Sequence, residues 1–329
     1  MSLAEPEVDA TVPDVSVLVV GYNSAALISD CLTSIGRASP KTPVEILFTD
    51  NGDGATEEVV RRDFPDVTII PSMGNVGFAA GNNMLAKEAS AHNLLLLNPD
   101  MVLTPGAIDT LVIGARAHPE AAAWGGVTTD AEGQPDSGNA IAIPSIPEFI
   151  SVALGRSLVG SRPIKGIAAD EAVEVLSGGF VMFKRSAWNE AGGLDDRFFL
   201  YCEEVDLFYR LAQRGHTFWR IAAARGYHKV GHGEGKSPMR LLYRATGTME
   251  FVRHHWNWQS RKLAAFLIWL GAAERYGAGL LLGWLKPQLR DMKIGYSLVA
   301  LRPSLWRRGY DPERGLLARL RQEKAEDAR

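Results

Sequence analysis

Apolar runs alternate with periodic, mixed segments along the first hundred residues of the chain. Residues 15–20 (VSVLVV) form an apolar, β-branched run before Gly21, which is typical of a strand buried on both faces. Residues 24–36 place apolar side chains three and four positions apart, which predicts an amphipathic helix. Further strands are expected at 44–49, 67–70 and 93–97, and further helices at 56–63 and 78–89. This alternation predicts an α/β fold with a mostly parallel sheet and helices on both faces.

The second half of the chain has a different pattern. Residues 130–170 are rich in Gly, Pro and Ser and weakly periodic, which predicts loops around a crevice. Strand-like segments follow at 173–184, where Ser-Gly-Gly interrupts the run, and at 217–223, with a helix expected at 204–214. The expected organisation is a flexible leader over 1–13, an α/β domain over 14–236, and a helical, basic, tryptophan-rich C-terminal region over 237–329.

Polar residues follow each of the four strands expected in the first hundred residues. Parallel strands place their carboxyl ends at one edge of a sheet, where open α/β sheets bind ligands. We therefore expect one binding crevice lined by Tyr22, Asn23, Asp50, Asn51, Asn75 and Asp100. The chain has no G-x-G-x-x-G opening a helix after the first strand and no G-x-x-x-x-G-K-[ST]. Dinucleotide-dependent oxidoreductases and P-loop enzymes are therefore disfavoured.

The composition is that of a folded protein, with 46% hydrophobic and 22% charged residues among 329. The acidic first residues lack an apolar h-region, so we expect no signal peptide. The most apolar stretch, residues 263–285, is interrupted by Glu274 and Arg275, and we expect that it does not span a bilayer. Cys31 and Cys202 fit no metal-ligand spacing and are expected to be free thiols.

The net charge of −3 is unevenly distributed. Residues 240–310 hold 12 Lys and Arg against 3 Asp and Glu, a local +9, so the rest of the chain carries −12. The same segment holds five of the eight tryptophans. This mixture is typical of a surface that contacts anionic lipid headgroups, whereas a helical cap packed on the α/β domain gives the same composition. No recognition motif accompanies the charge, so nucleic-acid binding is disfavoured.

Two acidic positions carry candidate chemistry. Asp100 follows a wholly apolar strand, and a carboxylate there suits Mg²⁺ or Mn²⁺, although a turn or a helix cap uses Asp in the same way. Glu203, Glu204 and Asp206 lie within four residues, where mutual repulsion raises a carboxylate pKa. A raised pKa suits a general base, and the alternative is an acidic first helical turn stabilised by the helix dipole.

Histidines lie at two places in the second half of the chain. His228 and His232 flank Gly231 directly after an expected strand. Neutral imidazole binds divalent ions, and the alternative is a pair of polar loop histidines. His254 and His255 lie in the basic region and are expected at the surface.

Five segments, in order, resemble the inverting family 2 glycosyltransferases of the GT-A fold. Within that family they resemble the rhamnosyltransferase-like branch that builds bacterial surface polysaccharides. The segments are residues 15–23 (VSVLVVGYN), 49–51 (TDN), 74–83 (GNVGFAAGNN), 95–100 (LLLNPD) followed by 105–108 (PGAI), and 192–206 (GGLDDRFFLYCEEVD). The third resembles N-x-G-F-A-x-G-x-N, the fourth a variant of the metal-binding D-x-D, and the fifth G-G-F-D-E-x-F-F-L-Y-x-E-D-x-D. The resemblance covers about residues 15–255 and implies a GT-A fold with a C-terminal helical appendage.

The resemblance implies a nucleotide-sugar site at residues of the first four segments. The residues implied to contact the nucleobase and ribose are Val20, Tyr22 and Asp50. Those implied to lie near the diphosphate or to shape its loop are Asn75, Gly77 and Asn83. Asn51 and Asn98 are the remaining residues of the implied donor site.

The resemblance also implies a metal site and a catalytic base. Asp100 would bind Mg²⁺ or Mn²⁺ between the two phosphates, and His228 would help to hold the metal or the diphosphate. Glu204 stands where the family has a catalytic Asp, with Glu203 and Asp206 in support. Since glutamate is longer by one methylene, Glu203 and Asp206 remain alternatives for the base.

The implied reaction is a single displacement that inverts the anomeric carbon. The implied donor is dTDP-rhamnose or a UDP-hexose, and the acceptor is a lipid-linked or polysaccharide glycan. The implied location is cytoplasmic, with peripheral contact to the inner face of the plasma membrane. A non-catalytic binding or scaffold subunit and a nucleotidyltransferase are the alternatives. Tyr22-Asn23-Ser24 in place of a Gly-rich basic loop disfavours the latter, and Asp53 and Gly233 depart from a Ser that is frequent in the family.

Overall fold

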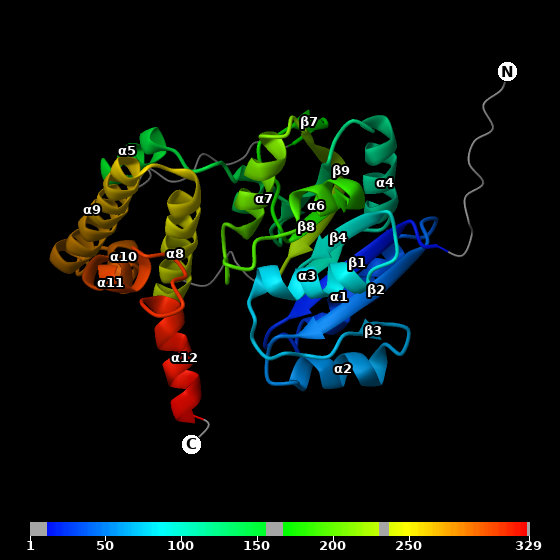
Figure 1. Ribbon diagram of the computed structural model, residues 1–329, viewed down its shortest axis with the longest axis horizontal. Coiled ribbons are helices and arrows are strands. Elements are labelled where there is room, and N and C mark those ends of the chain that lie inside the picture. Colours follow the sequence, from blue (N-terminus) through cyan, green and yellow to red (C-terminus); the bar gives the residue numbers. More distant parts are fainter. Residues whose placement is uncertain (1–11, 156–166, 230–236, 328–329) are drawn as a thin grey trace.

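The protein is built on a nine-stranded mixed sheet with helices on both faces and a layer of C-terminal helices to one side (Figure 1). The structure is a computed structural model that describes residues 12–155, 167–229 and 237–327. The strands are β1 Val15–Gly21, β2 Val44–Asp50, β3 Thr68–Ile69, β4 Asn93–Leu97, β5 Met101–Leu103, β6 Ala123–Thr129, β7 Glu171–Ala172, β8 Phe180–Lys184 and β9 Phe218–His228. Their order in the sheet is β3-β2-β1-β4-β8-β6-β9-β5, with β7 paired to β9.

The first half of the sheet follows the sequence pattern closely. β1 pairs in parallel with β2 and β4, and β2 pairs in parallel with β3. Every residue of β1 is buried, as its unbroken apolar run predicts for a central parallel strand. The carboxyl ends of these strands therefore meet at one edge, where the expected crevice residues follow them.

The second half of the sheet mixes strand directions. β8 runs antiparallel to β4 and β6, while β6 and β9 are parallel. The strand expected over residues 173–184 is limited to Phe180–Lys184, since Ser177 and the two glycines after it form a turn. The strand expected at 217–223 extends to His228 because it pairs with β6, and its last residues pair with β5. The directions of these strands are set by pairing between segments distant in sequence, and they cannot be predicted from the local alternation of apolar residues.

Helices cover the two faces of the sheet with separate apolar clusters. One cluster joins α1, α2 and α4 to β1, β4 and β9, and the other joins α3, α6, α7 and the C-terminal helices to the opposite face. The helices before residue 213 are α1 Ile28–Ala38, α2 Ala55–Asp63, α3 Phe78–Glu88, α4 Ala107–Ala117, the 3₁₀ turn η1 Ser137–Ala140, α5 Ile146–Ala153, α6 Arg185–Ala191 and α7 Glu203–Ala212. The C-terminal helices are α8 Pro238–His255, α9 Trp258–Leu282, α10 Pro287–Leu301, α11 Pro303–Trp306 and α12 Leu316–Asp327.

The expectation of loops throughout residues 130–170 is wrong at α5. Ser145 caps this helix by accepting a hydrogen bond from the backbone N–H of Glu148, in the Ser-x-x-Glu arrangement that marks helix starts. The helix buries Phe149 and Ala153, and it packs against α9. α5 therefore joins the C-terminal helical layer although it precedes that layer in the sequence.

Among the described residues, α9 is the one helix long and apolar enough to cross a membrane by length and composition. Only 28% of its most apolar stretch is buried inside the protein. Arg275, in its middle, is 2% exposed and donates hydrogen bonds to the carbonyl oxygens of Val152 in α5 and Gly271. The charge that interrupts the apolar stretch is thus used to join α9 to α5.

Candidate active site

The ends of β1 and β2 bring the first group of candidate residues together. Gly21 and Asp50 are paired across the two strands, and Asp50 is buried. The Asp50 carboxylate accepts hydrogen bonds from the backbone N–H of Gly52 at 2.7 Å and of Glu57, in the first turn of α2, at 3.1 Å. Val20 is buried against α3, whereas Tyr22 is 55% exposed beside it. Tyr22 is therefore open to a ligand, while the Asp50 carboxylate also holds the loop that surrounds it.

The loop before α3 contacts two parts of the site, the turn after β2 and the segment that leads to α7. Asn51 donates a hydrogen bond from Nδ2 to the carbonyl oxygen of Gly77 at 2.8 Å, and Asn75 accepts one from the Gly77 N–H at 3.2 Å. Gly77 has φ +90°, and a Cβ there would lie 2.5 Å from the carbonyl oxygen of Phe199. Only glycine permits this approach. The conformation of the loop is thus fixed by its contact with the segment that leads to α7.

Asn83 makes a second connection to the same segment. Its Nδ2 donates to the carbonyl oxygen of Leu194 at 2.7 Å and to the Asp196 carboxylate at 2.6 Å, and its Oδ1 accepts from the Leu194 N–H. The side chain is fully engaged by protein groups in this way. Among the roles expected for Asn83, these contacts are those of a residue that shapes a loop.

Asp100 and His228 meet because β5 and β9 are paired. Met101 is registered with His228, so Asp100 lies beside the end of β9. The His228 Nε2 is 2.9 Å from Asp100 Oδ2, and its Nδ1 is 3.7 Å from Asp136 Oδ2. Burial lowers the pKa of His228, but its hydrogen bonds to Asp100 and Asp136 outweigh that effect and raise the pKa to about 9. The two carboxylates therefore favour the protonated form of the imidazole.

Asp136 was not expected from the sequence. It is buried, and its Oδ1 accepts hydrogen bonds from the Thr128 hydroxyl and the Gly138 N–H, each at 2.6 Å. In sequence, Asp-Ser-Gly after a proline is typical of a turn or a helix cap, and Asp136 does cap η1. Its position opposite His228 depends on the parallel pairing of β6 with β9, which no local signal reports.

The surroundings of Asp100 fit a hard divalent cation. Its Oδ1 is buried and has no hydrogen-bond partner in the part of the chain that the structure describes. A buried carboxylate oxygen without a donor is costly unless a cation or water satisfies it. Among the described residues, no group of three or more His, Cys, Asp or Glu side chains is arranged so that it could hold a metal ion, so the protein would supply few of the ligands. Mg²⁺ and Mn²⁺ sites commonly have this composition, with water and substrate phosphates as the remaining ligands. His232 lies outside the described residues.

Glu203 and Glu204 begin α7 directly after a strained turn. Tyr201 and Cys202 have φ values of 66° and 70°, a left-handed conformation that side chains other than glycine rarely adopt. Tyr310, from the C-terminal region, donates a hydrogen bond from its hydroxyl to the carbonyl oxygen of Leu200. Such strain persists only where neighbouring structure enforces it, and here it fixes where α7 starts.

The pKa values of both glutamates are raised, with different contributions from their neighbours. Burial raises the pKa of Glu203 well above its ordinary value, and the charge of Glu204 raises it further. Burial also raises the pKa of Glu204, while hydrogen bonds, including one from the Glu203 side chain, and the charge of Arg244 lower it. Burial and the charge of Glu204 therefore favour the protonated form of Glu203, next to a Glu204 whose pKa is raised less. Each glutamate has a buried Oε2 without a hydrogen-bond partner among the described residues.

Asp206 has different surroundings although it belongs to the same helical turn. It is buried, and its two oxygens accept from Arg210 Nε and from His255 Nε2, each at 2.7 Å. Arg210 also donates to the carbonyl oxygens of Ala191 and Gly193. The expectation that His255 is a surface residue is wrong, since its side chain is 15% exposed and hydrogen-bonded to Asp206. Asp206 thus connects α7 to α8 and to the end of α6.

The Ser-Gly-Gly turn before β8 lies between the turn that carries Asp100 and the start of α7. The Asn98 N–H, two residues before Asp100, donates to the carbonyl oxygen of Gly179 at 3.1 Å. A Cβ on Gly179 would lie 3.1 Å from Asn98 Nδ2, and one on Gly178 would lie 3.8 Å from the Cβ of Glu204. The turn that carries Asp100 and the helix that carries Glu204 therefore flank the same pair of glycines. A carboxylate with an unpartnered buried oxygen suits a cation, and a buried glutamate with a raised pKa suits a proton acceptor.

Substituting Gly247 with alanine is expected to destabilise the protein by about 1–3 kcal/mol, because overpacking has that cost. A Cβ on Gly247, in α8, would overlap the carbonyl oxygen of Tyr201 in the strained turn. Gly277→Ala is the matched control, since that helical glycine has open space around its Cβ and alanine favours helix. Chemical denaturation measures both effects. Equal stability of the two variants would show that α8 does not enforce the turn.

Comparison with known proteins identifies the family of the chain and several relatives. The family model described as "Glycosyl transferase family 2" matches residues 16–192, more than half of the chain. N-acetylglucosaminyl-diphospho-decaprenol L-rhamnosyltransferase of Mycobacterium tuberculosis is 28% identical over 273 residues, covering 74% of this chain and 86% of the relative. Rhamnosyltransferase WbbL of Escherichia coli is 24% identical over 196 residues, covering 57% and 74%.

A solved structure shows the same architecture. The mannosyltransferase PcManGT from Pyrobaculum calidifontis, in complex with GDP-Man and Mn²⁺, aligns with a TM-score of 0.56 at 18% identity and covers 90% of this chain and 88% of its own. This similarity confirms the expected α/β fold of the GT-A type with its helical C-terminal region.

Proposed function

The chain belongs to glycosyl transferase family 2, and from this premise we propose that it transfers a rhamnosyl or hexosyl residue from a nucleoside-diphosphate sugar to a lipid-linked or polysaccharide acceptor. The observation that carries the proposal is the placement of the Asp100 turn and Glu204 on either side of Gly178 and Gly179. The curated relatives named above are rhamnosyltransferases, and the name of one gives a diphospho-decaprenol lipid as its acceptor. These names favour dTDP-rhamnose over a UDP-hexose as the donor.

Asp100 and His228 would hold Mg²⁺ or Mn²⁺ at the donor diphosphate. A bound divalent cation neutralises the charge that develops on the departing nucleoside diphosphate. The buried, unpartnered Oδ1 of Asp100 is the protein group best placed for this contact. His228 would help to hold the cation as a neutral imidazole, and Asp136 would orient the ring from its Nδ1 side.

Glu204 would accept the proton of the attacking acceptor hydroxyl. Its pKa is raised by burial, which makes it a stronger base than an exposed carboxylate, and Glu203 keeps it ionised by donating a hydrogen bond. Asp206 is already engaged by Arg210 and His255, and so it positions α7. A single displacement with this base inverts the anomeric carbon and requires no covalent intermediate.

The nucleoside would occupy the edge formed by β1 and β2. Tyr22 offers an exposed aromatic ring there, and Asp50, Asn51 and the loop at Asn75 and Gly77 surround it. Asn98 lies between this edge and Asp100.

The acceptor and the location of the protein follow from the same proposal. A lipid-linked acceptor is presented at a membrane surface, and we place the protein in the cytoplasm, peripheral to the inner face of the plasma membrane. α9 would not span the bilayer, because Arg275 is buried against α5 and the helix packs along α10.

Screening a panel of nucleotide sugars for metal-dependent turnover tests the proposal. The purified protein is incubated with Mn²⁺, each donor and a polyprenyl-diphosphate-linked sugar, and released nucleoside diphosphate is measured. Release is expected with dTDP-rhamnose or a UDP-hexose and is expected to stop when EDTA removes the metal. Absence of release with every donor, or release unaffected by EDTA, contradicts the proposal.

A further inference from the structure

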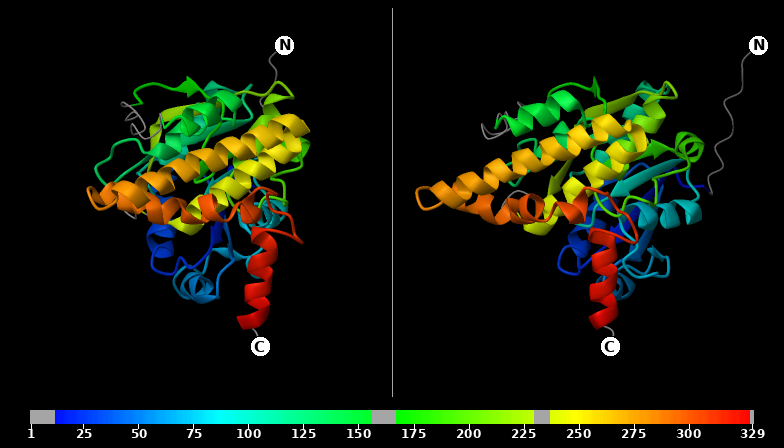
Figure 2. Two further views of the ribbon diagram at one scale, coloured as in Figure 1. Left: turned by 90° about the vertical axis from the view of Figure 1, so that its left-hand side faces the viewer. Right: turned by 60° about the vertical axis from the view of Figure 1, so that its left-hand side comes forward.

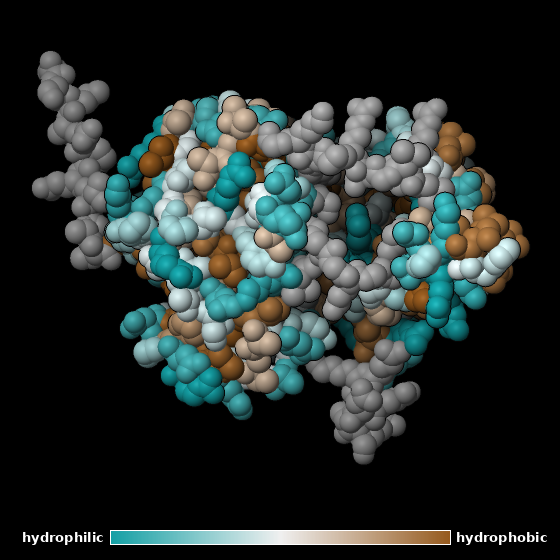
Figure 3. Space-filling view, turned by 180° about the vertical axis from the view of Figure 1, so that it is seen from behind, coloured by the Kyte–Doolittle hydropathy of each residue, from teal (hydrophilic) through white to brown (hydrophobic). Residues whose placement is uncertain are grey.

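The turn between α9 and α10 exposes a group of large apolar side chains. Five of the six residues from 280 to 285 are exposed, with Trp284 82% and Leu281 71% exposed, and the set is Leu280, Leu281, Leu282, Trp284 and Leu285. This hairpin tip, residues 280–285, projects beyond the rest of the molecule in the right-hand view of Figure 2. Figure 3 shows apolar side chains gathered at the same end of the protein. Single exposed leucines are ordinary, but a contiguous apolar patch marks an interaction site.

The hairpin tip is held in a fixed shape by close helix packing. A Cβ on Gly279 would lie 2.6 Å from the backbone N of Lys293, and one on Gly283 would lie 3.3 Å from the Cα of Arg290. The Trp284 Nε1 donates a hydrogen bond to the carbonyl oxygen of Leu281 at 3.1 Å. The two helices therefore meet closely enough that these large side chains cannot fold back between them.

Basic side chains surround the hairpin tip. Lys286, Arg290 and Lys293 are exposed, and Asp291 is the one acidic residue between positions 280 and 294. Within the described parts of the chain, none of the three cations has an ion-pair partner. Their charge is thus available to an anionic partner.

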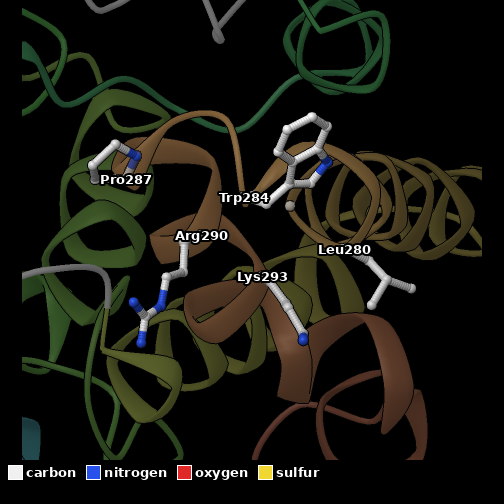
Figure 4. Close-up of a pocket in the computed structure, with 7 residues that line it drawn as sticks. Leu280, Trp284, Pro287, Arg290 and Lys293 are labelled. Atoms are coloured by element: carbon white, nitrogen blue, oxygen red, sulfur yellow. The ribbon is translucent and has the colours of Figure 1, made fainter.

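A cleft of about 460 Å³ joins the charged and apolar groups. Its lining includes Leu280, Trp284, Arg290 and Lys293 (Figure 4). In that view, Arg290 and Lys293 extend in the same direction, and Trp284 lies on the other side of the cleft. Two cations beside an indole and a leucine match a lipid phosphate with the start of its acyl chain.

We infer that the hairpin tip docks the protein on a bilayer that contains anionic phospholipid, with Trp284 and Leu281 in the interface and Arg290 and Lys293 at the phosphates. A projecting tip enters a flat, deformable surface more readily than it fits a flat protein face, and tryptophan with Lys and Arg is the composition of membrane interfaces. This inference identifies the surface that would contact the membrane. It rests on the proposed function only for the reason for that contact, which is access to a lipid-linked acceptor.

Sedimentation of the full-length protein with lipid vesicles tests this inference. The wild type is expected to sediment with phosphatidylcholine vesicles that contain phosphatidylglycerol, and less with phosphatidylcholine alone. The variant Leu281→Ser/Trp284→Ser is expected to bind at least about tenfold more weakly, because two large apolar groups no longer leave water. The variant Arg290→Gln/Lys293→Gln is expected to lose the preference for phosphatidylglycerol, since each basic residue near an anionic surface contributes to binding.

Trp258→Ser is the matched control, because Trp258 is also exposed but lies at the opposite end of α9. Its vesicle binding is expected to equal that of the wild type. Wild-type protein that ignores both kinds of vesicle, or hairpin variants that bind like the wild type, overturn the inference. Conversion of a dimer to a monomer by the hairpin substitutions, with unchanged vesicle binding, overturns it in favour of contact between two copies. Release of nucleoside diphosphate with a water-soluble acceptor is measured alongside, so that failure of docking is distinguished from failure of the proposed activity.

Discussion

Replacing Glu204 with glutamine is expected to lower kcat by about 10³-fold, the usual contribution of a general base. The amide keeps the size of the side chain but cannot accept the proton of the acceptor hydroxyl. Since Glu204 has no part in the nucleotide contacts proposed at β1 and β2, binding of the nucleoside diphosphate with Mn²⁺ should change little. Steady-state release of nucleoside diphosphate and calorimetric titration measure the two quantities separately.

Glu203→Gln is the matched control for this prediction. The pKa of Glu203 is raised well above its ordinary value, which favours its protonated form, and a glutamine amide can likewise donate a hydrogen bond to Glu204. The expected fall in kcat is less than about tenfold, because the substitution changes the donor of one hydrogen bond to Glu204 but does not remove the bond. A large loss in Glu203→Gln together with full activity in Glu204→Gln would assign the base to the other glutamate.

Replacing Asp100 with alanine is expected to lower metal-dependent turnover by about 10³-fold or more, because a bound cation contributes several kcal/mol at the leaving group. The substitution removes the buried Oδ1 that has no partner among the described residues and the Oδ2 that pairs with His228. Turnover at increasing Mn²⁺ concentration measures the loss. Additional Mn²⁺ should not restore full activity, since the protein supplies few other ligands.

Asp130→Asn provides the comparison for Asp100→Ala. Asp130 accepts hydrogen bonds from the backbone N–H groups of Glu132 and Gln134 in an exposed turn after β6. An asparagine oxygen accepts the same bonds, so activity and Mn²⁺ dependence should remain those of the wild type. If Asp100→Ala also keeps a wild-type response to Mn²⁺, the metal is bound elsewhere or is not required.

The part of the site that sequence predicts best lies at the ends of the parallel strands. Apolar runs identify β1, β2 and β4, and parallel pairing then places Asp50 and the Asp100 turn at one edge without further information. The acidic cluster of Glu203, Glu204 and Asp206 is predicted from spacing, but the different partners of its three carboxylates are not. Asp206 is paired with His255, which follows it by a whole helix and a strand, and this pairing exists only in the folded chain.

Other features depend on contacts between distant segments and are absent from local patterns. The antiparallel orientation of β8 and the position of Asp136 opposite His228 are fixed by strand pairing across the sheet. The strained turn at Tyr201 and Cys202 requires Gly247 of α8 and Tyr310 of the segment between α11 and α12, which both follow it in the sequence. α5 is an exception, because its Ser-x-x-Glu cap was present in the sequence and would have identified the helix.

The position of Mn²⁺ in crystals grown with a nucleoside diphosphate tests the central claim most directly. Anomalous scattering at the manganese edge should give a peak about 2.1 Å from an Asp100 carboxylate oxygen, bridging to the diphosphate, with the Glu204 carboxylate facing the sugar side of the same cavity. A peak remote from Asp100, or a Glu204 carboxylate that faces away from the bound diphosphate, would contradict the account.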